Sequence, residues 1–243
     1  MDEIKNRLLK GKGINKLEKD IKPRQWERIS VDKVLSEEFI RTFQDRVDWS
    51  SISSSQKLSE EFIKEFQKKV NWGRISKHQV LSENFIREFQ HLVHWSGISY
   101  NQILSEEFIR EFDEEINWFV VSNQQKLSEN FFRDYINKIN WSEISRKQKL
   151  SMGFIREFQN KLDWEYISLN ENLYLSDDFL LEFKNKIKWE YYLANQKTSF
   201  LIMKQFIIKT KFKSIKRFKI KHFTVDQISE IERMLELKYM FEK

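Results

Sequence analysis

The stretch LSEEFIRTFQDRVDWSSISSSQK, residues 35–57, decides the fold, because LSEEFIKEFQKKVNWGRISKHQV at 58–80 repeats its pattern over the next 23 residues. The leucine–serine pair keeps this spacing, and all eight tryptophans follow it, 23 residues apart six times and then 25. Two additional residues in the segment 169–174 account for the longer interval. Self-similarity at a short fixed period indicates a repeat architecture. The tryptophans are Trp26, Trp49, Trp72, Trp95, Trp118, Trp141, Trp164 and Trp189.

Each unit has the pattern of two short helices. Ser36 is a good N-cap, and Glu37 and Glu38 place negative charge in the first turn, where the helix dipole favours it. The apolar spacing predicts a first helix of about 12 residues. A second helix of about six to eight residues follows, capped by Asp or Asn directly before the tryptophan and ending near Gln56. The apolar face of the first helix consists of Leu35, Phe39, Ile40, Phe43 and Val47.

Neither helix is long enough to be stable alone, so the units must stack on one another. Only 5 glycines and 1 proline are available for turns, which argues against a sandwich or barrel. We therefore expect an all-α fold, an α-solenoid of about seven 23-residue helix-turn-helix repeats with atypical terminal caps, and a monomer. The tryptophan row is interpreted as packing between units rather than as a surface that stacks bases, sugars or methylated cations.

The charged and amide side chains recur with the same period. Glu37 and Arg41 stand in the favourable i,i+4 orientation, as do their equivalents in other repeats. This spacing predicts a solvated surface whose charges compensate within each helix. Such a surface is poorly suited to binding phosphates. The glutamine row, Gln56, Gln79, Gln102, Gln125 and Gln148, is expected to bond the backbone of the neighbouring turn, with partner binding as the alternative.

The composition divides the chain into three segments. Residues 1–26 form an expected N-terminal capping helix and linker, residues 27–196 the repeat solenoid, and residues 197–243 a basic C-terminal segment with a capping helix. The last segment carries twelve Lys and Arg against five Asp and Glu. Thr224 to Gln227 resemble a capping box, and Val225, Ile228, Ile231 and Leu235 form the apolar stripe of a helix that closes the solenoid.

Lysines in this last segment alternate with Phe212, Ile215, Phe218 and Ile220. Such clusters bind nucleic acid, anionic membrane surfaces or acidic proteins, and a solvated cap explains the pattern equally well. The candidate nucleic-acid-binding residues are Lys209, Lys211, Lys213, Lys216, Arg217, Lys219 and Lys221.

The sequence gives no support for catalysis. It has no cysteine and 4 histidines, and it lacks nucleotide-binding, hydrolase and zinc-protease motifs. His91 and His94 are spaced i,i+3 without a further ligand cluster, and His94 replaces the usual cap before a tryptophan. We therefore expect no enzyme activity, no metal site and no cofactor. The longest apolar stretch, 200–203, is too short for a transmembrane segment, and no signal-peptide pattern is present, which favours an intracellular protein.

The unit quoted first, over residues 35–53, resembles tandem short helical repeats in giant (nucleocytoplasmic large DNA) viruses, which are mostly uncharacterised. The resemblance covers roughly residues 26–196 and carries over no functional residue. It implies a viral product in the host cytoplasm or nucleus, or in the virion.

The first functional hypothesis is a non-enzymatic scaffold for protein–protein interaction, in which recognition residues occupy positions where the units differ. Nucleic-acid binding through the basic segment and an architectural role in a virion are the alternatives. The protein partner is not identified by the sequence. The candidate protein-binding residues are Arg74, Tyr100, Phe119, Val120 and Tyr166.

Overall fold

The computed structural model describes residues 2–14, 18–211 and 222–241. Over these ranges the chain is helical and contains no β-strand, and the helices repeat with the period of the sequence. The protein is an α-solenoid, as predicted. The chain divides into two compact units, Met1–Asn117 and Trp118–Lys243, and each is described by itself.

In both units, helices that follow a Leu-Ser pair alternate with helices that begin at a tryptophan, hereafter Ser-capped helices and Trp helices. The first unit contains α1 (Asp2–Gly11), η1 (Glu18–Asp20), α2 (Pro23–Asp32), α3 (Glu37–Thr42), α4 (Trp49–Ser55), α5 (Glu60–Glu65), α6 (Trp72–His78), α7 (Glu83–Glu88), α8 (Trp95–Asn101) and α9 (Glu106–Glu111). The second contains α10 (Trp118–Gln124), α11 (Glu129–Asp134), α12 (Trp141–Lys147), α13 (Met152–Glu157), α14 (Trp164–Leu169), α15 (Asp177–Glu182), α16 (Trp189–Asn195), α17 (Phe200–Phe206), η2 (Ile207–Lys209) and α18 (Val225–Phe241).

The Ser-capped helices are shorter than predicted. In α3, Ser36 Oγ accepts a hydrogen bond from Phe39 N (3.2 Å), as expected for the N-cap. The helix then ends after six residues, because Phe43 leaves helical geometry (φ −111°, ψ 27°) and its carbonyl accepts bonds from Arg46 N and Val47 N in a separate turn. The expected helix of about 12 residues is therefore wrong. The break lets the chain turn within the short unit while Val47 remains buried.

The Trp helices begin and end where the sequence predicts. Asp48 Oδ1 accepts a hydrogen bond from Ser51 N (2.7 Å), and Asn71, Asn140 and Asp163 cap their helices in the same way. His94 is the N-cap residue of α8, as expected for a variant cap, but its side chain makes no capping bond. An imidazole is bulkier than the short Asp and Asn side chains that reach the N2 and N3 amides from this position.

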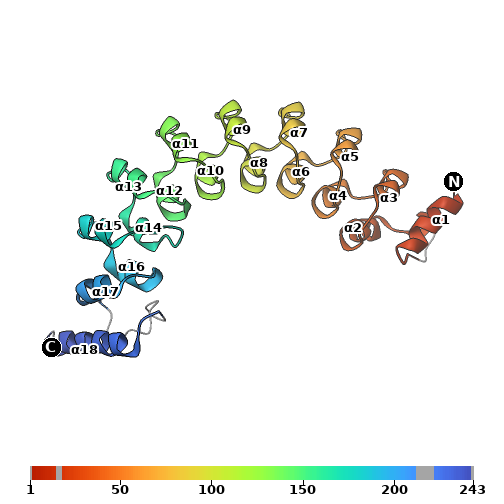
Figure 1. The fold of residues 1–243 in the computed structure, drawn as a ribbon. Helices are drawn as coiled ribbons and strands as arrows, with labels where there is room; N and C mark the ends of the chain where they lie inside the picture. The colour runs from red at the N-terminus through yellow and green to blue at the C-terminus, as the bar shows by residue number, and fades with distance from the viewer. Residues whose placement is uncertain (1, 15–17, 212–221, 242–243) are drawn as a thin grey trace. The chain divides into compact units, whose positions relative to one another are not determined.

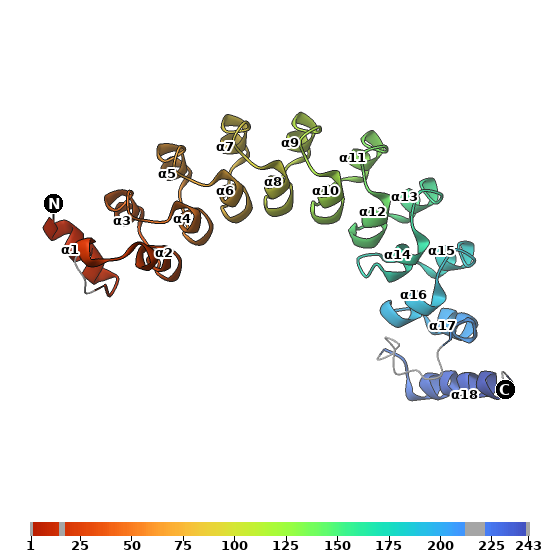
Figure 2. The same ribbon diagram turned by 180° about the vertical axis from the view of Figure 1, so that it is seen from behind.

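Within each unit the Ser-capped helices form one row and the Trp helices a second row, as Figures 1 and 2 show from opposite sides. The Trp helices stack side by side, and each tryptophan ring packs on an aromatic ring of the next repeat. Trp49, for example, lies 4.9 Å from Phe66 between ring centroids, and Trp72 lies 5.1 Å from Phe89. The packing role predicted for the tryptophans is confirmed.

The glutamine row ties each repeat to the one before it. Gln79 Oε1 accepts a hydrogen bond from Leu58 N (3.1 Å), and its Nε2 donates to the carbonyl oxygens of Ser53 (2.9 Å) and Gln56 (2.8 Å). Gln56 and Gln102 make the same three bonds to their preceding repeats. The predicted polar ladder is confirmed, and it satisfies backbone groups that the connections would otherwise bury unpaired.

Both ends of the array depart from the repeat. At the start, Glu18 accepts bonds from Lys5 (2.7 Å) and from Arg46 (3.4 Å), and the bond from Lys5 lowers the pKa of Glu18. This network joins α1 and η1 to the turn that follows α3, the first Ser-capped helix.

At the other end, α17 repeats the Ser-capped geometry once more, and its Phe206 stacks on Trp189 with 3.6 Å between ring centroids. The helix α18 packs on α17 and η2, and the predicted capping box is present, because Thr224 and Gln227 exchange bonds of 3.0 and 3.2 Å. Ile231 and Leu235 are buried, whereas Val225 is 78% exposed and does not belong to the packed stripe. Val225 is the first residue of the helix, one turn short of the packed surface.

Candidate interaction surfaces

The charged rows are paired between repeats more closely than within them. Arg41 Nε lies 2.8 Å from a carboxylate oxygen of Glu65 in the next repeat, against 3.5 Å for the predicted i,i+4 partner Glu37. The ladder continues through Lys64–Glu88 and Arg87–Glu111, and through Arg133–Glu157 and Arg156–Glu182 in the second unit. The hydrogen bond from Arg133 lowers the pKa of Glu157. These cations are therefore neutralised by neighbouring carboxylates.

The acids at the start of the Ser-capped helices have a second role that the sequence did not reveal. Glu37 Oε1 accepts a hydrogen bond from Ser59 N (2.8 Å), and Glu83 accepts one from Ser105 N (2.6 Å). Each carboxylate thus binds the backbone of the next N-cap residue, so this row holds repeats together.

The candidate protein-binding residues all belong to Trp helices, with Arg74 on α6, Tyr100 on α8, Phe119 and Val120 on α10, and Tyr166 on α14. Tyr100 and Phe119 are 57% and 55% exposed, and Arg74 is also exposed. Val120 and Tyr166 are half-buried and offer less surface. Arg74 and Tyr100 lie in the first compact unit and the other three candidates lie in the second.

Sequence reasoning missed an exposed row in the extended segment before each Leu-Ser pair. Val80 and Ile103 stand at this position in successive repeats of the first unit, with 93% and 95% of their surface exposed. Lys57 and Lys126 occupy the same position in other repeats, and this substitution of lysine for an aliphatic residue is the sequence signal of an exposed site.

The basic segment is described only in part. Lys209 and Lys211 are exposed, and Lys209 Nζ lies 4.9 Å from the centroid of the Phe206 ring. The candidates Lys213, Lys216, Arg217, Lys219 and Lys221 lie outside the described residues.

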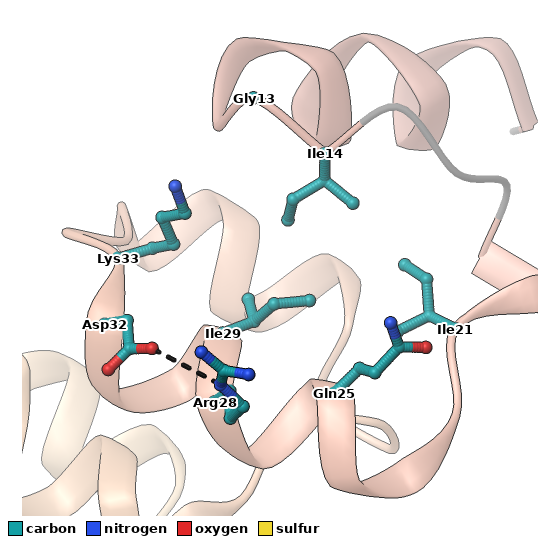
Figure 3. Close-up of a pocket in the computed structure, with 8 residues that line it drawn as sticks. All are labelled: Gly13, Ile14, Ile21, Gln25, Arg28, Ile29, Asp32 and Lys33. Carbon is teal, nitrogen blue, oxygen red and sulfur yellow. Dashed lines mark ion pairs between the residues drawn. The ribbon is translucent and has the colours of Figure 1, made fainter.

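A cavity of about 320 Å³ lies between the segment after α1 and α2, the helix that contains Trp26. Figure 3 shows Ile14 pointing from the segment after α1 toward α2, where Ile21 and Ile29 border the same space. At its rim Arg28 pairs with Asp32 at 3.7 Å, and both side chains are largely exposed. The cavity is an apolar gap beside an exposed ion pair, without a buried unpaired polar group among its lining residues.

The described ranges hold no group of three or more His, Asp or Glu side chains arranged to bind a metal ion. None of the described helices is both long and apolar enough to cross a membrane. Comparison with protein-family models, with curated proteins and with solved structures found no match to this chain.

Proposed function

We propose that this chain is a non-enzymatic α-helical repeat protein that acts as a scaffold for protein–protein interaction. The observation that carries the proposal is the exposure of aromatic rings on Trp helices: Tyr100 and Phe119 are more than half exposed, and no other repeat has an aromatic residue at either position. Aromatic residues are enriched at the centres of protein interfaces, where they supply much of the binding energy.

The remaining rows of the repeat support the same proposal. Tryptophan, glutamine and acids such as Glu37 and Glu83 at the start of Ser-capped helices are taken up by contacts between repeats. A frame held in this way leaves the variable positions of the Trp helices to change without loss of the fold.

The variants Phe119→Ser and Tyr100→Asn test this function, because Ser50 and Asn123 hold the same positions in other repeats. We expect each to weaken binding of a partner recovered with the wild-type protein by about tenfold or more, as for an interface hot spot. Titration calorimetry with the purified partner gives the affinity. Val34→Lys is the matched control, because Val34 is 85% exposed outside the Trp helices and Lys57 is its equivalent. Equal affinity for all variants would contradict the proposal.

Nucleic-acid binding through the basic segment is the second candidate, favoured by the exposure of Lys209 and Lys211. Under this alternative, Lys209→Glu with Lys211→Glu weakens binding to duplex or single-stranded oligonucleotides by about tenfold or more at low salt, and the slope of affinity against salt becomes shallower. Fluorescence anisotropy across a salt series measures both. Lys57→Glu, an exposed lysine of the array, is the control. Binding that is absent or independent of salt would remove this candidate.

The resemblance of the repeat to sequences of giant viruses extends the proposal to the setting of the protein. We infer a viral product of the host cytoplasm or nucleus, or a virion component in which the array spaces other parts. Mass spectrometry of purified virions separates the two settings.

A further inference from the structure

The last Ser-capped helix, α17, and η2 directly after it carry exposed aliphatic side chains where the other repeats do not. Leu201 is 62% exposed, two residues after its capping serine, where every earlier Ser-capped helix has Glu, Asp, Asn or Gly. Ile208 is 48% exposed, nine residues after the serine, where every earlier repeat has Asp, Glu, Asn, Lys or His. Both positions therefore change from small or polar to aliphatic in this repeat alone.

Leu201 and Ile208 lie on the same side of α17 and η2, hereafter the outward side. They are seven residues apart, about two helical turns, and Lys204 between them is also exposed. The helix α18 packs on α17 and η2 beside them and still leaves both side chains exposed (Figures 1 and 2). The buried side consists of Ile202, Met203, Phe206 and Ile207.

The stability of α17 does not explain these two residues. An acid in the first turn of a helix interacts favourably with the helix dipole, and Leu201 gives up this interaction. Exposed leucine and isoleucine also place aliphatic surface in water, which is unfavourable until something covers it. The described contacts of the chain leave about half or more of each side chain uncovered, so a cover from outside the chain accounts for both.

Cations accompany the aliphatic side chains. Lys209 and Lys211 are exposed, and residues 197–225 contain nine Lys and Arg but no Asp or Glu. Of the four acids of α18, Glu230 reaches the outward side, where it pairs with Lys204. The combination of aliphatic side chains with positive charge favours an anionic surface that has an apolar interior.

The kind of cation separates a lipid surface from other anionic partners. Eight of the nine cations are lysine, which is depleted at protein interfaces, whereas arginine is enriched there. Nucleic acid engages cations and aromatic faces and leaves Leu201 and Ile208 without a role. An anionic bilayer attracts lysine through its surface potential and buries aliphatic side chains at the boundary of headgroups and acyl chains.

We propose that the outward side of α17 and η2 binds the surface of a membrane that contains anionic lipids. Leu201 and Ile208 enter the boundary between headgroups and acyl chains, and Lys209 and Lys211 lie near the lipid phosphates and carboxylates. The inference goes beyond the proposed scaffold function and does not depend on it, because Tyr100 and Phe119 belong to α8 and α10.

Co-sedimentation of the full-length protein with vesicles tests this site. The vesicles contain phosphatidylcholine and phosphatidylserine at about seven to three, and vesicles of phosphatidylcholine alone provide the comparison. We expect binding to the mixed vesicles that is about tenfold or more stronger than to phosphatidylcholine and that weakens as salt is added, because salt screens the attraction of lysine to the lipid.

The double variant Leu201→Asn, Ile208→Asn removes the aliphatic groups without changing the charge. Asparagine holds these positions in other repeats, as in Asn84 and Asn185, so the variant should fold, which its thermal melting verifies. We expect its binding to the mixed vesicles to be about tenfold weaker. Val80→Asn with Ile103→Asn is the matched control, because it removes exposed aliphatic groups from the first unit and should leave binding unchanged.

The membrane site is overturned by mixed vesicles that do not bind, by equal binding to both kinds of vesicle, or by equal binding of wild type and the double variant. An oligonucleotide that binds while the vesicles do not would assign the cations to nucleic acid instead. Sedimentation velocity tests a second copy of the chain: a dimer that the double variant dissociates would overturn the membrane site. Phe119 and Tyr100 variants that keep full affinity for a protein partner contradict the scaffold alone.

Discussion

Replacement of Phe62 by alanine is expected to lower the free energy of unfolding by about 4 kcal/mol, the largest effect of a single substitution in the array. Phe62 is fully buried, lies 4.7 Å from Phe66 and 6.2 Å from Trp49 between ring centroids, and has the Arg41 guanidinium 4.9 Å above its ring. The substitution leaves a cavity at the junction of two repeats, so it weakens the contact between repeats as well as the helix itself.

Urea unfolding followed by tryptophan fluorescence measures this loss, and amide hydrogen exchange shows whether it is concentrated in the repeats beside residue 62. Phe119→Ala is the matched control, because Phe119 is 55% exposed and its truncation should cost less than about 0.5 kcal/mol. Similar losses for the two variants would show that Phe62 is not a packed core residue.

Replacement of Gln79 by methionine is expected to lower the free energy of unfolding by about 3 kcal/mol. Methionine has a similar shape but removes all three hydrogen bonds to the preceding repeat, so Leu58 N and the carbonyl oxygens of Ser53 and Gln56 lose their partners in a buried environment. The desolvation of these groups, rather than the lost bonds themselves, accounts for most of the effect.

The same unfolding measurement checks this prediction. Gln67→Met serves as the control, since Gln67 is exposed and makes one long bond to Lys64 O (3.3 Å). A loss below about 1 kcal/mol for Gln79→Met would mean that water forms the hydrogen bonds to Leu58 N and to the Ser53 and Gln56 carbonyl oxygens. The glutamine ladder would then add little to the free energy of unfolding.

The N-cap, tryptophan and glutamine rows could be predicted from sequence because each reflects a local rule or a fixed period. The N-caps follow from the chemistry of Ser, Asp and Asn, and the bonds of Gln79 follow from its place at the end of a helix in every repeat. The early end of α3 could not be predicted from residue preferences, because phenylalanine does not normally break a helix. The turn at Phe43 is instead set by the packing of the residues on either side of it.

The partner of Arg41 was also beyond the sequence, because a period of 23 places a glutamate both four residues before it and 24 residues after it. Only the stacking of the helices decides between Glu37 and Glu65. The exposed candidates Tyr100 and Phe119 could be found as departures from the repeat. Leu201 and Ile208 are the same kind of departure, but their exposure beside α18 requires the three-dimensional structure.

The polar bonds between repeats also determine how such a chain lengthens during evolution. Each joins residues at a constant separation, 21 for Leu58 to Gln79 and 22 for Glu37 to Ser59, so duplication of a whole repeat preserves every bond, whereas loss of a single residue disrupts several. The connection at 169–174 shows how an exception is absorbed: Asn170, one position earlier than the usual glutamine, bonds the carbonyl oxygens of Ser145 and Gln148 (both 2.9 Å). New length therefore enters by whole units, except where a residue such as Asn170 takes over the bonds of the glutamine.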